Sequence, residues 1–214
     1  MDRLAAHYAS LALQPEVEEG EEPPERVIAV LVSTAVDESL LEIALAKLGL
    51  TSLLLSVNNS AEAVAHLCAE TGATHLIHGP KYASVAAEAA RILNGDREDP
   101  GTGSLAPTTL AQPIQNGSKA RTTAPRLQLV EDRRFPLWGP GGVRSAKICA
   151  FPPRLSPEQE SRRTCVILHS SGSTGFPKPV FVTHYGMVAN AAVSVPKTGF
   201  SALPLYHGFG HFSM

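Results

Sequence analysis

Between residues 27 and 93, short apolar runs alternate with longer segments in which apolar residues recur at helical spacing. Three of the short runs have the length and composition of buried strands, and the first of them is rich in β-branched residues. These predicted strands are Val27–Val32, Leu53–Val57 and His75–His78. Because strands that alternate with helices at this pitch form parallel βαβ units with helices packed on the sheet, the pattern predicts an α/β fold.

A helix is predicted after each of these strands, and most of the helices carry start or stop signals. Leucine and alanine residues at helical spacing mark a first helix at 37–48, with Gly49 at the position of a C-cap. The string 59–62 resembles a capping box and opens a second helix, which Gly72 ends. A third, alanine-rich helix is predicted at 81–93. The helices therefore complete the βαβ pattern.

Residues 94–125 break the alternation. Gly, Pro, Ser, Thr, Asn and Gln dominate this segment, and its apolar residues follow no period. The segment is too polar to bury a core and too long for an ordinary loop, so we predict a disordered insert. Order is expected to resume near Leu127, with a possible strand at 147–151 and a polar connection at 152–163.

The last part of the chain contains further strands around a polar loop. Apolar runs at 164–169 and 179–183 predict two strands, and a helix at 184–195 and a strand at 200–205 follow them. The expected division of the chain is a flexible acidic N-terminus at 1–26, a βαβ segment at 27–93, the insert at 94–125 and a loop-bearing segment at 126–214.

Composition and charge narrow the class of protein. Of the 214 residues, 43% are hydrophobic and 18% are charged, which is typical of a soluble globular protein. The formal net charge of -2 gives no reason to expect nucleic acid or an anionic membrane as a partner. The first residues resemble neither a signal peptide nor a membrane span, so a cytoplasmic protein is expected. Cys68, Cys149 and Cys165 form no metal or redox motif, and we expect buried, reduced thiols and no metal site.

One polar loop is suited to binding an anion. Ser170 to Gly175 place four hydroxyl groups and two glycines between two predicted strands, and Lys178 follows after Phe-Pro. Glycines let backbone N–H groups converge on one anion, hydroxyl groups add donors, and the lysine supplies a compact positive charge. The string is not a P-loop, in which Gly and Lys are adjacent and a helix follows. A solvated Gly/Ser hairpin is the alternative, but the ordered string between two strands favours phosphate binding.

The string Ser171-Gly-Ser-Thr-Gly-Phe-Pro-Lys178 resembles the signature of the adenylate-forming superfamily, which includes acyl-CoA synthetases, luciferases and nonribosomal peptide synthetase adenylation domains. The longer string 169–179 most resembles fungal synthetase-like enzymes, in which an adenylation domain commonly precedes a carrier and a reductase domain. Residues 27–78 are similar to the superfamily's first βαβαβ segment, and 203–210 are similar to its next core motif. The resemblance implies the N-terminal subdomain of an adenylate-forming enzyme, truncated and carrying a disordered insert.

The resemblance implies attack of a carboxylate on the α-phosphate of ATP, bound with Mg²⁺, to give an acyl-adenylate and pyrophosphate. It makes Lys178 catalytic, because a fixed positive charge stabilises the leaving pyrophosphate. His207 is the second implied catalytic residue, near the carboxylate and adenylate, with a core or surface histidine as the alternative. His184 and His211 are expected to be structural. The implied phosphate contacts are Ser170, Ser171, Gly172, Ser173, Thr174, Gly175 and Lys178.

Two interpretations of the function remain open. In the first, the chain is part of a carboxylate-activating ligase that takes ATP and a small carboxylic acid and works with a downstream carrier or reductase domain. In the second, it is a non-catalytic fragment with at most residual nucleotide or partner binding, because the superfamily's later Mg²⁺, ribose and lysine motifs do not follow. An unrelated phosphate-binding hairpin is a third, less favoured interpretation. We expect the chain alone not to exchange pyrophosphate into ATP, and to leave strand edges open.

Overall fold

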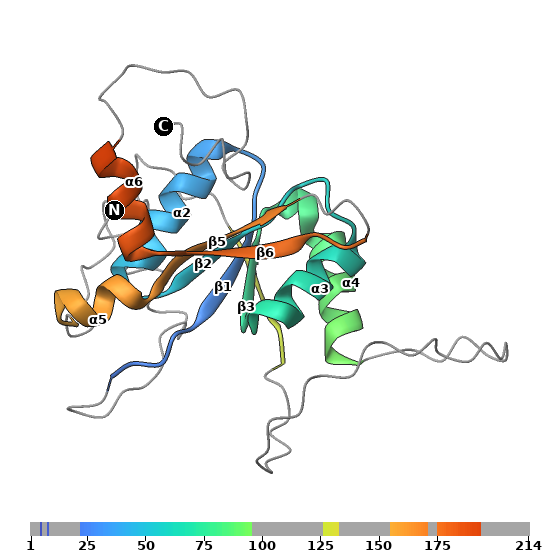
Figure 1. Ribbon diagram of the computed structural model, residues 1–214. Helices are drawn as coiled ribbons and strands as arrows, with labels where there is room; N and C mark the ends of the chain where they lie inside the picture. The colour runs from blue at the N-terminus through green and yellow to red at the C-terminus, as the bar shows by residue number, and fades with distance from the viewer. Residues whose placement is uncertain are drawn as a thin grey trace, which may run out of the picture.

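The strands of the computed structural model form one mixed sheet, with six strands among the residues described (Figure 1). The structure describes Ala5, Tyr8 and residues 22–95, 126–132, 155–170 and 175–193. The strands are β1 (Val27–Leu31), β2 (Thr51–Leu54), β3 (His75–His78), β4 (Gln128–Glu131), β5 (Thr164–Ser170) and β6 (Lys178–Thr183). Their order in the sheet is β4-β3-β1-β2-β5-β6, and neighbours pair in parallel except β5 and β6, which are antiparallel.

Helices connect the parallel strands and cover both faces of the sheet (Figure 1). They are α2 (Ala35–Lys47), α3 (Ala61–Thr71), the 3-10 helix η1 (Pro80–Tyr82), α4 (Ala83–Asn94), α5 (Pro157–Arg162) and α6 (His184–Val193). In the sheet, β1 lies between β2 and β3. The connection from β2 to β3, which contains α3, must therefore cross over β1. It does so on the face opposite α2, and α4 packs beside α3.

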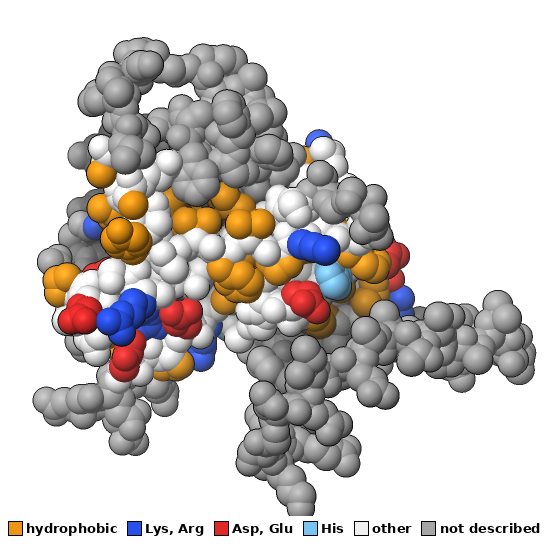
Figure 2. All heavy atoms as spheres, viewed as in Figure 1, with side chains coloured by type: hydrophobic (Ala, Val, Ile, Leu, Met, Phe, Trp, Pro, Cys, Tyr) orange, Lys and Arg blue, Asp and Glu red, His pale blue; other side chains and the backbone are white. Residues whose placement is uncertain are grey.

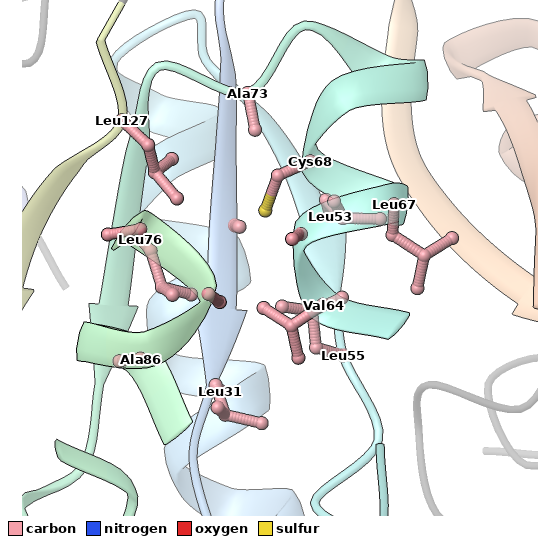
Figure 3. Close-up of a cluster of buried hydrophobic side chains, with 14 of the residues drawn as sticks. Leu31, Leu53, Leu55, Val64, Leu67, Cys68, Ala73, Leu76, Ala86 and Leu127 are labelled. Atoms are coloured by element: carbon pink, nitrogen blue, oxygen red, sulfur yellow. The ribbon is translucent and has the colours of Figure 1, made fainter. Parts of the chain in front are cut away.

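Alternate residues of β1 face two separate hydrophobic cores. Ile28 and Val30 pack in the core under α2, whereas Ala29 and Leu31 pack in the core under α3 and α4. Figure 3 shows the second core, in which side chains of α3 and α4 point toward those of β1, β2 and β3. A strand that is covered on both faces has no solvent side, which explains its continuous apolar sequence. The predicted α/β fold is confirmed.

Capping residues begin and end the helices near the predicted positions. Ser60 caps α3, where its hydroxyl accepts the N–H of Ala63 at 3.3 Å. The capping box expected at 59–62 is therefore wrong in register, because Ser60 is the cap and alanine stands three residues later. Gly49 and Gly72 have φ of 71° and 66°, a left-handed conformation that glycine adopts without strain at the end of a helix.

Helix α5 corrects the prediction for residues 152–163. That segment was expected to be a polar connection, but Ser156 and Gln159 form a capping box that opens α5 within it. Six residues are too few to show an apolar period, and none of those in α5 is buried, so the apolar pattern does not indicate the helix. The sequence signal that does indicate it is Ser156 followed by Pro157 and Gln159, a helix start. The strands predicted at 147–151 and 200–205 lie outside the described residues.

Two residues of the predicted flexible N-terminus pack in a core. Ala5 and Tyr8 are buried in the core under α2, and the Tyr8 hydroxyl donates to Oδ1 of Asp132 at 2.9 Å. Burial, followed by the charge of Asp132, raises the pKa of Tyr8, because a phenolate would be both desolvated and repelled there. The flexibility predicted for residues 1–26 stays a prediction, although these two residues within it are buried.

The side chain of Asn94 links the end of α4 to the start of β4. Its Oδ1 accepts the N–H of Leu127 at 2.9 Å, and its Nδ2 donates to the carbonyl of Leu127 at 3.4 Å. One side-chain amide thus pairs with both backbone groups of Leu127, much as a neighbouring strand would. The contact lies at the amino ends of the parallel strands. The insert predicted at 94–125 lies outside the described residues, apart from Asn94 and Gly95.

Candidate functional site

The predicted phosphate loop joins β5 to β6 at the carboxyl edge of the parallel strands. β5 ends at Ser170, β6 begins at Lys178, and these two residues are register partners in the antiparallel pair. The sheet therefore brings the first and the last of the predicted phosphate contacts side by side. In open α/β sheets this edge is the usual place for ligands, because the loops that follow the strands gather there.

Three of the predicted phosphate contacts are described, and all three are exposed. They are Ser170, Gly175 and Lys178. An exposed hydroxyl group beside an exposed ammonium group provides donors and positive charge, which suits the oxygen atoms of a polyphosphate. Residues 171–174 and His207 lie outside the described residues, so their predicted roles stay predictions.

His169 stands immediately before the loop and is buried. Its Nε2 accepts the backbone N–H of Ser56 at 3.0 Å, and Nδ2 of Asn59 lies 3.5 Å from the same atom. Because Nε2 accepts a hydrogen bond, the neutral ring carries its proton on Nδ1. His169 thus connects the end of β5 to the turn between β2 and α3.

The turn between β2 and α3 is closed by hydrogen bonds of its own. The carbonyl of Ser56 accepts the N–H of Asn59 at 3.1 Å, and its Oγ accepts the N–H of Asn58 at 3.2 Å. Ser60 follows directly as the cap of α3. The turn and α3 therefore form one compact unit. Within the turn Ser56 uses its carbonyl and its hydroxyl group, while its N–H donates to His169 of β5.

Phe176 follows Gly175, the last of the predicted loop glycines, and contacts α3. Its ring stacks on that of His66, with 5.1 Å between the ring centroids and 25° between the planes. The side chain of Phe176 is 50% exposed, so the stack lies at the surface. Both flanks of the loop thus contact the same unit, formed by α3 and the turn before it.

The side chains of β6 change character along the strand. Lys178 is its charged residue and lies next to the loop. Farther along, exposed hydrophobic side chains contribute to a band over β6 and α6 on the face shown in Figure 2. The exposed large hydrophobic residues of these two elements are Val180, Phe181, Tyr185 and Val188. The charge at the loop is therefore adjacent to an apolar surface.

Of the two described cysteines, one is buried as the sequence predicts and the other is not fully buried. Cys68 is buried and Cys165 is partly buried. Burial is the main cause that raises the pKa of their thiols, to about 12 and about 11. Both thiols are therefore protonated near neutral pH. Cys149 lies outside the described residues.

No group of three or more His, Cys, Asp or Glu side chains described by the structure could hold a metal ion. His184 begins α6, where its backbone N–H donates to the carbonyl of Arg163 at 3.0 Å, and its expected structural role stays a prediction. Within the same described ranges, no helix is long and apolar enough to cross a membrane.

Sequence reasoning missed the partners of His169, Phe176 and His66. His169 belongs to the motif string, but its acceptor role depends on Ser56, 113 residues earlier in the chain. His66 interrupts no pattern in its helix, and its contact with Phe176 requires β6 to lie beside α3. The sequence does show a ring on each side of the loop, in His169 and Phe176, but it does not show what these rings contact.

Comparison with known proteins agrees with this fold. A family model described as AMP-binding enzyme matches residues 5–214. The adenylate-forming reductase stbB of Stachybotrys bisbyi is 31% identical over 178 residues, which cover 79% of this chain. The chain spans only 14% of the length of the curated relatives it matches.

Two solved structures share the fold at low sequence identity. The N-terminal domain of FACL13 from Mycobacterium tuberculosis has a TM-score of 0.60 at 18% identity, over 99% of this chain and 44% of that one. ATP-bound MatB from Rhodopseudomonas palustris has a TM-score of 0.59 at 15% identity, over 99% of this chain and 35% of that one. At these identities the likeness shows the fold alone.

Proposed function

The chain belongs to the AMP-binding enzyme family, and from this premise we propose that its β5–β6 loop binds the phosphates of ATP during formation of an acyl-adenylate. The observation that carries the proposal is the register pairing of Ser170 with Lys178 at the carboxyl edge of the sheet. This pairing puts a hydroxyl group and a positive charge at the two ends of a loop rich in Gly, Ser and Thr.

In the proposed reaction a carboxylate oxygen of the acid attacks the α-phosphorus of ATP. The bond from that phosphorus to the pyrophosphate oxygen breaks, and pyrophosphate leaves with the electron pair. Lys178 and Ser170 would stabilise the negative charge that develops on pyrophosphate, together with the predicted contacts at 171–175. His207 is proposed to lie near the carboxylate and the adenylate.

Other parts of the proposal concern the nucleotide, the acid and later steps. The solved structure of MatB is ATP-bound, which supports ATP as the nucleotide. Mg²⁺ is proposed to arrive with ATP, because the described residues include no group of three or more His, Cys, Asp or Glu side chains that could hold a metal ion. The Stachybotrys relative is an adenylate-forming reductase, which supports a small carboxylic acid as substrate and a carrier or reductase domain as the next partner. A cytoplasmic location is also proposed.

Lys178→Ala tests the proposed phosphate contact. We expect this change to weaken the binding of pyrophosphate and of MgATP about tenfold or more, because a charge-assisted hydrogen bond to phosphate is lost. Lys47→Ala is the matched control, because Lys47 ends α2 at the opposite, amino edge of the sheet. Isothermal titration calorimetry measures both affinities. Equal affinities of the Lys178→Ala and parent proteins would contradict the proposal.

Exchange of labelled pyrophosphate into ATP tests the reaction itself, with a panel of carboxylic acids. Exchange that depends on the acid and is lost in Lys178→Ala supports adenylation by this chain. Binding of MgATP without exchange supports the alternative function, phosphate binding without adenylation, which is the outcome expected from the sequence. The two measurements together therefore separate the two functions.

A further inference from the structure

The two flanks of the candidate loop are attached to the same unit of the fold. His169 precedes the loop and accepts a hydrogen bond from the turn between β2 and α3. Phe176 follows the loop and stacks on His66 in the middle of α3. Apart from the β5–β6 pairing itself, these contacts link the loop ends to a part of the chain more than a hundred residues earlier.

The contact on the β5 side is a buried hydrogen bond to a backbone group. Ser56 and His169 are both buried, and the N–H of Ser56 donates to Nε2 of His169 at 3.0 Å. A buried N–H that loses its acceptor costs free energy, so this bond restricts where Ser56 and His169 can lie. Because Ser170 is the next residue, its position follows from that of His169.

The contact on the β6 side is an aromatic stack at the surface. The rings of His66 and Phe176 lie nearly parallel, with 25° between their planes. Phe176 is separated from Lys178 by Pro177 alone, and proline restricts the backbone to a narrow range of φ. A stacked Phe176 therefore restricts where Lys178 begins β6.

We propose that His169 and the His66–Phe176 stack are positioning residues, which fix Ser170 and Lys178 relative to α3 for phosphate binding. This inference rests on the proposed function, because Ser170 and Lys178 are its described phosphate contacts. His169, His66 and Phe176 act through these two residues and need not touch the nucleotide. Preorganised donors bind a polyphosphate more tightly because less conformational freedom is lost on binding.

A matched pair of variants tests the buried hydrogen bond. In His169→Gln the side-chain oxygen can accept the N–H of Ser56, whereas His169→Phe keeps a ring but has no acceptor. We expect pyrophosphate affinity to fall roughly tenfold in His169→Phe, as for a lost buried hydrogen bond, and to fall much less in His169→Gln. Calorimetric titration gives the affinity, and a thermal melt gives the stability of each variant.

A second pair tests the stack. His66→Phe keeps an aromatic ring against Phe176, and His66→Ala removes it. We expect pyrophosphate affinity to fall roughly fivefold in His66→Ala and to stay near that of the parent in His66→Phe, given the usual strength of aromatic pairs. If His169→Phe and His66→Ala melt at lower temperature but bind pyrophosphate as the parent does, the residues are purely structural and the inference is overturned.

A ligand-free measurement keeps this inference distinguishable from the proposed function. If the parent protein binds neither pyrophosphate nor MgATP, the proposed function fails. Amide hydrogen exchange at Ser170, Phe176 and Lys178 then reports the positioning by itself. Faster exchange in His169→Phe and His66→Ala than in the parent, with recovery in His169→Gln and His66→Phe, supports positioning. Equal rates in all five proteins contradict it.

Discussion

Burial changes the acid–base behaviour of two side chains in the packing between α2 and β5. Glu42 of α2 is largely buried, and desolvation raises the pKa of its carboxyl group to about 7. Cys165 of β5 is affected by burial first and then by the charge of Glu42, which together raise the pKa of its thiol. A group whose pKa rises on folding binds a proton more tightly in the folded state. Its contribution to stability is therefore present at low pH and is lost as the pH rises through about 7.

Glu42→Gln is expected to remove this pH dependence. The free energy of unfolding of the parent should decline relative to that of the variant between pH 4.5 and about pH 7, because ionised Glu42 must lose its hydration in the folded state. The lowered pKa of His75, due mainly to burial, acts in the opposite direction in both proteins and cancels in the difference. Urea denaturation at several pH values measures the difference, and parallel curves would show that Glu42 does not contribute.

For individual residues, the sequence predicts which polar residues form the loop but not which contacts hold them in place. Ser170 and Lys178 were expected at a phosphate site, and the structure places them side by side. Residues 171–174 and His207 remain predictions. The roles of His169 and His66 could not be predicted, because each depends on a contact between segments far apart in the sequence. Hydrophobic periodicity assigns a residue to an element and a face, whereas such contacts depend on how the elements pack.

Among the elements, β6 is exposed at the edge of the sheet. It pairs with β5 on one side, and no other described strand pairs with its second edge. Val180 and Phe181 of β6 are 47% and 55% exposed. An unpaired strand edge with apolar side chains favours association with another chain.

Phe181→Lys is expected to reduce concentration-dependent association of the 214-residue chain. A charge on an edge strand opposes pairing with a second strand because it would have to be desolvated. Ile43→Lys is the matched control, since Ile43 is 47% exposed on α2, away from the edge of the sheet. Sedimentation velocity over a range of concentrations measures the association. Identical behaviour of Phe181→Lys and the parent would exclude β6 as the associating surface.

The elements themselves were predictable where they are long or buried on both faces. β1, β3, α2 and α3 agree closely with their predicted ranges, since their apolar residues have one dominant period. β2 overlaps the strand predicted at 53–57 but is shifted toward the N-terminus. It begins at Thr51 because Thr51 and Ser52 are buried polar residues, which an apolar pattern does not include. β4 and α5 are short and largely exposed, so their formation depends on pairing with β3 and on a capping box.

At the scale of the whole molecule, the carboxyl ends and the amino ends of the parallel strands form two edges of the sheet, and these edges have different features. The carboxyl edge carries the turn after β2, the start of α3 and the β5–β6 loop. The amino edge carries the end of α4 and the start of β4, which Asn94 joins through its two hydrogen bonds to Leu127. A change at the amino edge is therefore expected to leave the candidate site intact.

Replacing residues 96–125 with a short Gly/Ser linker is expected to move the thermal midpoint by no more than about 4 °C, because the entropy of loop closure varies slowly with loop length. Adding Asn94→Ala to the shortened chain should lower its stability by about 1–2 kcal/mol, since the backbone groups of Leu127 lose their partner. Differential scanning calorimetry measures both changes, and a collapse of the transition in the shortened chain would contradict the expectation. If the shortened chain keeps its thermal midpoint, the contact between Asn94 and Leu127 is a position where a reporter domain or a shorter linker can replace residues 96–125 without disturbing the sheet.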